Sequence, residues 1–135
     1  MTRLTLRIDF DNCQLGPGKI KLLELIDRYG SITASGKMMD MSYRTAWLLI
    51  DELNNMFVSP LVETRIGGRG GGNARLTVLG RAVVQLYRGI EDEAHESAGA
   101  KLRELERHIR PVEKPAEKVV TRSVRSKQKP AKQAT

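Results

Sequence analysis

Cysteine, aromatic side chains and long apolar runs are all scarce in this chain of 135 residues. The single cysteine, Cys13, cannot form a disulfide within the chain or supply a multi-thiolate metal site. The longest uninterrupted apolar run, residues 46–50, is far too short to cross a bilayer, so we expect no membrane contact and a cytoplasmic protein. Aromatic residues make up only 4% of the chain, so the core must be aliphatic, which favours a helical domain.

Groupings of chemically reactive side chains are equally scarce. His95 and His108 lie on one expected helix without a cysteine or another histidine nearby, and the acidic residues of positions 91–96 spread around that helix. The glycine-rich segment 67–72 is not followed by the Lys-Ser/Thr of a phosphate-binding P-loop. We therefore expect no enzyme, no metal site and no cofactor.

The positive charge of the chain is concentrated at one end. The formal net charge is +7, of which residues 1–109 account for +1 and residues 110–135 for +6. Three prolines interrupt this last segment, and its apolar residues are too few to form a core. We expect residues 110–135 to be a disordered basic tail, so the high overall pI says little about the folded part.

Apolar periodicity predicts a strand followed by three helices. Residues 3–10 alternate as in a half-buried strand, and residues 19–29 follow helical spacing up to Gly30. Ser31 offers an N-cap for a short helix that ends near Met39, and Ser42 offers one for a stronger helix that ends before Pro60. Two short helices joined by a tight turn are typical of a helix-turn-helix.

The next segment predicts a β-hairpin. Residues 61–66 and 74–76 read as strands on either side of the glycine-rich loop, and the N-terminal strand is a candidate third member of their sheet. We therefore expect a mainly α fold with a small antiparallel sheet, a winged helix-turn-helix over residues 1–77.

A long helix is expected over residues 78–109, with Thr77 as its N-cap. From Val78 to about His108 it would extend about 46 Å, longer than a small domain is wide. Part of its apolar stripe therefore needs a second chain, and we expect a homodimer. The stripe residues expected to mediate dimerisation are Leu79, Val83, Leu86, Ile90, Ala94 and Leu102.

The helix that starts at Ser42 is the expected recognition helix. Its first turn is polar, and the first turn of such a helix is the part that meets base edges in the major groove. The hairpin adds arginines suited to phosphates or to a narrow minor groove. The expected DNA-contacting residues are Ser42, Tyr43, Arg44, Thr45, Arg65, Arg69, Asn73 and Arg75.

Several stretches resemble one family of regulators. The sequence GSITASGKMMDMSYRTAW of residues 30–47, LVETR of 61–65, GGRGGG of 67–72 and LTVLG of 76–80 are similar to the N-terminal domain of ModE, the molybdate-responsive regulator, whose broader relatives are the LysR-type regulators. The resemblance covers roughly residues 1–95 and implies a dimeric transcription factor, usually a repressor of molybdate uptake genes, that binds a palindromic operator in double-stranded DNA.

One departure bears on the effector. ModE proteins continue into molybdate-binding domains, whereas this sequence passes from the expected dimerisation helix into the basic tail, so direct binding of molybdate is doubtful. Two alternatives to a sequence-specific regulator stay open. One is a nonspecific architectural DNA-binding protein, favoured by the tail; the other is a winged helix that binds a protein partner.

Overall fold

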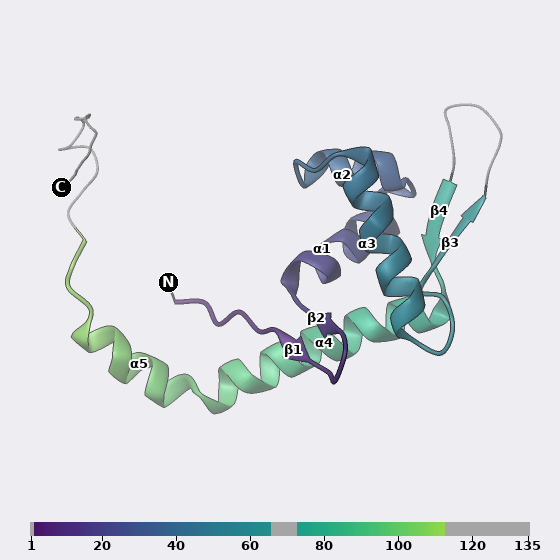
Figure 1. The fold of residues 1–135 in the computed structure, drawn as a ribbon. Helices are drawn as coiled ribbons and strands as arrows, with labels where there is room; N and C mark the ends of the chain where they lie inside the picture. Colours follow the sequence, from purple (N-terminus) through teal and green to yellow (C-terminus); the bar gives the residue numbers. More distant parts are fainter. Residues whose placement is uncertain (1, 66–72, 113–135) are drawn as a thin grey trace, which may run out of the picture. The chain divides into compact units, whose positions relative to one another are not determined.

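The computed structural model describes residues 2–65 and 73–112 (Figure 1), and the chain divides after Ala100 into two units. Helices dominate the described residues, with two small antiparallel sheets, so the expected winged-helix-like fold is confirmed. The elements are β1 (Ile8–Asp9), β2 (Gln14–Leu15), α1 (Pro17–Tyr29), α2 (Ile32–Met38), α3 (Tyr43–Met56), β3 (Val62–Arg65), β4 (Asn73–Leu76), α4 (Val78–Ser97) and α5 (Gly99–His108).

The ends of α1 follow directly from its sequence. Pro17 occupies the first helical turn, where its missing N–H costs nothing. Gly30 ends the helix at a φ of 69°, the left-handed region that glycine enters without strain, and its N–H donates to the carbonyl of Ile26. Helix α1 therefore begins two residues earlier than expected and ends where expected.

Two serine caps define the corner between α2 and α3. Ser31 Oγ accepts from the Ala34 N–H at 3.0 Å, and Ser42 Oγ accepts from the Thr45 N–H at 3.0 Å, so both predicted N-caps are confirmed. At the corner the two helices approach closely, because a Cβ built on Gly36 would lie 3.0 Å from Cβ of Ala46. This packing explains a glycine that costs helix stability within α2.

Strands β3 and β4 form the hairpin wing, with Val62 opposite Leu76 and Arg65 opposite Asn73. Its base is fastened by Asn54 of α3, whose Oδ1 accepts from the Leu61 N–H at 2.9 Å and the Val62 N–H at 3.0 Å. The side-chain amide of Asn54 also donates to the Val62 carbonyl at 3.2 Å. One side chain thus joins α3 to the first wing strand.

The N-terminal strand is much shorter than expected and does not join the wing. Only Ile8–Asp9 pairs with another strand, β2, in a separate sheet. The alternation of residues 2–8 is nevertheless real, because exposed and half-buried side chains follow each other as predicted. The segment lies beside α4 rather than the wing, since the Tyr87 hydroxyl donates to the carbonyl of Leu6 at 2.5 Å.

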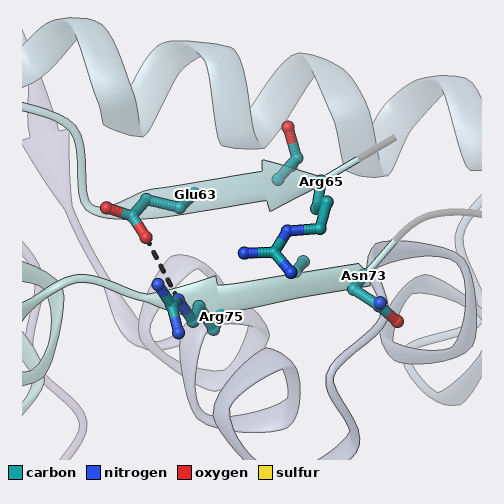
Figure 2. A pocket seen from close by; sticks show the side chains of 6 residues that line it. Glu63, Arg65, Asn73 and Arg75 are labelled. Atoms are coloured by element: carbon teal, nitrogen blue, oxygen red, sulfur yellow. Dashed lines mark hydrogen bonds and ion pairs between the residues drawn. The ribbon is translucent and has the colours of Figure 1, made fainter. Parts of the chain in front are cut away.

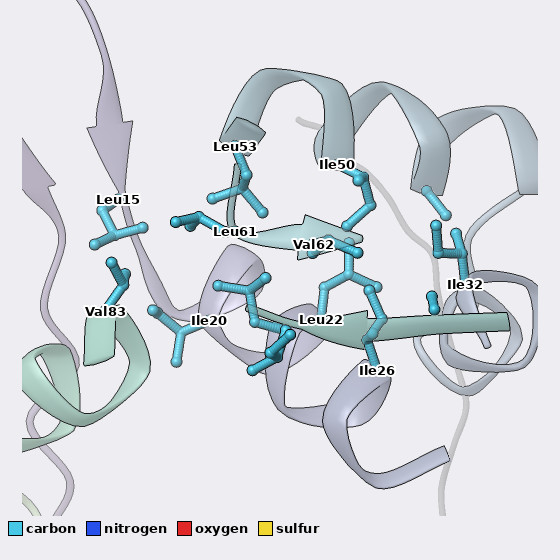
Figure 3. Close-up of a cluster of buried hydrophobic side chains, with 14 of the residues drawn as sticks. Leu15, Ile20, Leu22, Ile26, Ile32, Ile50, Leu53, Leu61, Val62 and Val83 are labelled. Carbon is cyan, nitrogen blue, oxygen red and sulfur yellow. The ribbon is translucent and has the colours of Figure 1, made fainter. Parts of the chain in front are cut away.

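The core lies between α1, α3, the wing and α4 (Figure 3). Aliphatic residues supply nearly all of it, as the low aromatic content requires, and Tyr87 is the aromatic exception. The core residues are Leu15, Ile20, Leu22, Leu23, Ile26, Ile32, Ala46, Ile50, Leu53, Leu61, Val62, Ala74, Leu76, Val83 and Tyr87.

The single helix expected up to about His108 is divided at Ala98. Helix α4 ends at Ser97, and Ala98 has φ −91° and ψ 4°, outside the helical range. Ser97 and Gly99 flank the break and are weak helix formers, and α5 buries no residue that would favour a continuous helix. Within α5, Glu104 pairs with Arg107 at 3.2 Å and with His108 at 3.1 Å.

A charged cluster ties α4 to α1. Arg88 donates to both carboxylate oxygens of Glu24, at 2.8 and 2.9 Å, and to Glu91 at 2.6 Å. The hydrogen bonds from Arg88 lower the pKa of Glu24 below its ordinary value and more than offset its partial burial. Burial next to this cluster raises the pKa of the Tyr87 hydroxyl.

Candidate nucleic-acid interface

The first turn of α3 presents the four polar residues expected at DNA. Ser42, Tyr43, Arg44 and Thr45 are all exposed. Ser42 is partly committed to the fold, because its hydroxyl accepts from the Thr45 N–H and donates to Thr45 Oγ1 at 2.9 Å. Within the described residues Arg44 forms no ion pair, so its guanidinium is available to a ligand.

Aromatic packing orders this turn further. The rings of Tyr43 and Trp47 meet edge to face, with centroids 6.1 Å apart and planes at 67°. Tyr43 remains 60% exposed, and Trp47 is half-buried, with an indole N–H that has no hydrogen-bond partner among the described residues. The motif of residues 42–47 therefore contributes an aromatic contact as well as polar atoms. The sequence analysis assigned no role to Trp47.

Helix α3 and the wing face each other across a hollow of about 260 Å³. Tyr43 and Trp47 line it from α3, Thr33 lines it from α2, and Arg65 and Asn73 line it from the two wing strands. Of the residues predicted separately, this hollow brings together Tyr43, Arg65 and Asn73, while Ser42, Arg44, Thr45 and Arg75 do not line it. In Figure 1 the two wing strands stand beside α3.

On the wing, Arg65, Asn73 and Arg75 share one face with Glu63 (Figure 2). Arg75 donates to the Glu63 carboxylate at 3.1 Å, with both side chains more than half exposed. The cationic character of Arg75 is therefore partly neutralised within the chain, a feature the sequence prediction missed because it depends on the register of the strands. Arg69 lies outside the described residues.

The expected dimerisation residues do not share one environment. Val83 is 5% exposed and belongs to the core, and Leu79 packs against the core. Leu86 and Ile90 are 67% and 43% exposed, and they lie four residues apart on one side of α4. Ala94 and Leu102 are half-buried. The open part of the stripe in α4 is therefore Leu86 and Ile90.

Over residues 2–65 and 73–112, no helix combines the length and apolar character needed to cross a membrane. In the same ranges, no three His, Cys, Asp or Glu side chains gather closely enough to hold a metal ion.

Two helices meeting at a serine-capped corner, with a two-stranded wing beside the second helix, define a winged helix-turn-helix domain. The chain is 42% identical over 106 residues to the molybdenum transport protein ModE of Azotobacter vinelandii, a match that covers 76% of this chain and 39% of that protein. It is 44% identical over 71 residues to the DNA-binding transcriptional dual regulator ModE of Escherichia coli K12, covering 53% and 27%.

A third relative carries a different name. The chain is 41% identical over 86 residues to the molybdenum-pterin-binding protein MopA of Rhodobacter capsulatus, covering 64% of this chain and 32% of that protein. No protein-family model matches the chain. The chain spans between about a quarter and two fifths of the length of these relatives, and the resemblance to ModE proteins is confirmed over the region that matches.

Proposed function

We propose that this protein is a sequence-specific DNA-binding transcriptional regulator of the ModE type, acting as a repressor of genes for molybdate transport or molybdoenzymes. The observation that carries the proposal is the exposed first turn of α3 opposite the wing. Arg44 is the residue expected to read sequence, because a guanidinium can bond the O6 and N7 atoms of guanine together. The printed name of the Escherichia coli relative, a DNA-binding regulator, supports the same function.

The other polar groups of this surface are assigned to the DNA backbone. Arg65 and Asn73 lie on the wing strands across the hollow from α3, where they can reach phosphates that flank the groove. Ser42 and Thr45 are engaged with each other, so their hydroxyls serve the geometry of the turn first. Backbone contacts position the helix, and base contacts determine the sequence preference.

Two copies of the chain are proposed to bind a palindromic operator. Leu86 and Ile90 give α4 an exposed apolar face that a second copy would cover by twofold symmetry. Such a dimer would present its two recognition helices to major grooves about 34 Å apart. Leu86→Asp is expected to convert a dimer to a monomer in sedimentation experiments and to lower operator affinity. A wild-type chain that sediments as a monomer at micromolar concentration would contradict the dimer. The DNA contacts are tested separately, by the binding experiment below.

The test of DNA recognition is selection of bound sites from random double-stranded DNA, followed by titration of the selected site. A true regulator recovers a palindrome, and Arg44→Ala is expected to lose at least about fivefold in affinity at each half-site, since one bidentate contact contributes about 1–3 kcal/mol of discrimination. Arg81→Ala is the matched control. Arg81 is also exposed, sits on α4 and lies 3.9 Å from the carboxylate of Asp27 in α1, so Arg81→Ala should bind as wild type does.

Other outcomes identify the alternatives. Equal binding to random DNA that is lost on removal of residues 110–135 would replace the regulator with an architectural DNA-binding protein. Failure of the wild-type chain to bind any DNA would favour a winged helix that binds a protein partner. In both cases the proposed sequence-specific function would be wrong.

A further inference from the structure

The outward face of α3 carries large apolar side chains as well as polar ones. Leu48 is 55% exposed and is absent from the core cluster and from the residues packed against it, although its neighbour Leu49 is among them. Leu48 follows Arg44 by one helical turn, so the two side chains lie on the same face of α3. An exposed leucine contributes little to folding, and this position therefore gives no structural reason for a large apolar residue.

Leu48 is part of a defined surface. It lines an open hollow of about 440 Å³ on α3, together with Tyr43, Arg44, Trp47 and Asp51. The two aromatic rings both line this hollow and are in edge-to-face contact with each other. Arg44 and Asp51 lie at its two ends along the helix. A cation and an anion seven residues apart leave the centre of the hollow apolar and without net charge.

A base edge suits this surface better than a phosphate does. A phosphate would meet the carboxylate of Asp51 and the apolar side chain of Leu48, which offer it no favourable interaction. Among the groups that bases present in the major groove, the 5-methyl of thymine is the apolar one. Leu48 lies about 6 Å from Arg44 along the helix axis, which corresponds to about two base-pair steps.

We infer that Leu48, flanked by the rings of Tyr43 and Trp47, reads the methyl group of a thymine within about two base pairs of the guanine contacted by Arg44. This inference rests on the proposed function and makes it more specific. Leu48 becomes a specificity-determining residue, and each half of the operator is expected to contain a guanine and a thymine at this spacing.

The experiment replaces single thymines of the selected site by uracil, which removes the methyl group and keeps every hydrogen-bonding atom of the base. At one thymine per half-site, wild-type affinity is expected to fall about fourfold, the factor that burial of one methyl-sized group is worth. Leu48→Ala removes the contact from both half-sites of the palindrome, so it is expected to lose about fifteenfold on the thymine site and to show no further loss on the uracil site. Val58→Ala, at a fully exposed valine just after α3, should keep the wild-type sensitivity to uracil.

The outcomes separate the inference from the function beneath it. If the wild-type chain selects no sequence, the proposed function fails. If it selects a palindrome but uracil has no effect at any position, the function stands and the inference is overturned. If uracil lowers the affinity of Leu48→Ala as much as that of wild type, another residue reads the methyl group and Leu48 does not. Because the uracil experiment on wild type needs no altered protein, poor folding of a variant cannot obscure it.

Discussion

Substitution of Gly80 by alanine gives the sharpest test of how α4 is attached to the wing. Gly80 is the third residue of α4 and is buried. A Cβ built at this position would lie 2.2 Å from the Leu61 carbonyl oxygen and 3.3 Å from Cβ of Leu76. The Leu61 oxygen is held in place, because it accepts from the Thr77 N–H at 2.9 Å. Ordinary contact begins at 3.4 Å, so backbone must move by about 1 Å.

The magnitude follows from the interactions that this movement breaks. Overpacking in a core typically costs about 1–3 kcal/mol, and a lost backbone hydrogen bond adds about 1 kcal/mol. The better helix propensity of alanine returns about 0.5–1 kcal/mol. Gly80→Ala is therefore expected to lower the free energy of unfolding by about 3 kcal/mol, which corresponds to a fall in Tm of at least about 12 °C for a domain of this size.

Gly89 provides a matched control in the same helix. A Cβ at Gly89 would meet nothing within 4 Å, so Gly89→Ala should show only the gain in propensity and stabilise the protein by about 0.5–1 kcal/mol. Urea unfolding can be followed through the fluorescence of Trp47, the single tryptophan, at one fixed chain concentration because a dimer unfolds in a concentration-dependent way. If both variants gain stability, the close contact between Gly80 and the wing is wrong.

Substitutions at three further positions test the fold and the interface. Asn54→Ala is expected to cost about 2–4 kcal/mol in urea unfolding because it leaves two backbone donors of the wing unpaired, and Asn54→Asp should cost less because it keeps the accepting oxygen. The lowered pKa of Glu24 adds stability that is present above its ordinary value of 4.5 and is lost as the pH falls below it. Arg88→Met should therefore unfold more easily by about 1 kcal/mol at pH 7, and a gap that stays equally large at pH 3 would refute this assignment. Glu63→Gln releases Arg75, so operator affinity should rise several-fold. The plot of log affinity against log salt concentration should also steepen by about one counterion for each Arg75 that meets a phosphate, whereas an unchanged slope would mean that Arg75 does not contact phosphates.

The sequence was a reliable guide wherever a single residue determines the local geometry. Ser31, Ser42 and Thr77 were each predicted as N-caps, and each accepts a hydrogen bond from the N–H three residues later. Gly30 was predicted to end α1 and does so with a positive φ. Such features depend on neighbours in the chain, so local rules suffice to predict them.

Features that depend on distant partners could not be predicted in the same way. The spacing of α4 indicates one apolar stripe, but only packing decides that Val83 enters the core while Leu86 stays in solvent. The alternation predicted for residues 3–10 was correct as far as Ile8 and wrong at Phe10, which is 49% exposed. The choice of β2 as the pairing partner depends on the turn between the two strands. The pair between Glu63 and Arg75 requires the register of the wing, which the sequence does not state.

The hydrogen bond from the Ala74 N–H to the Gly30 carbonyl, at 2.9 Å, has a consequence for binding. Gly30, which turns the chain from α1 into α2, also holds β4 through this hydrogen bond, so the wing and the helices are connected at the same residue. Their mutual orientation is then set during folding, and a ligand spanning both surfaces spends little of its affinity on arranging them. Under the proposed function, substitutions at Leu48 or at the wing arginines would change what is bound without altering the packing that holds α3 and the wing together.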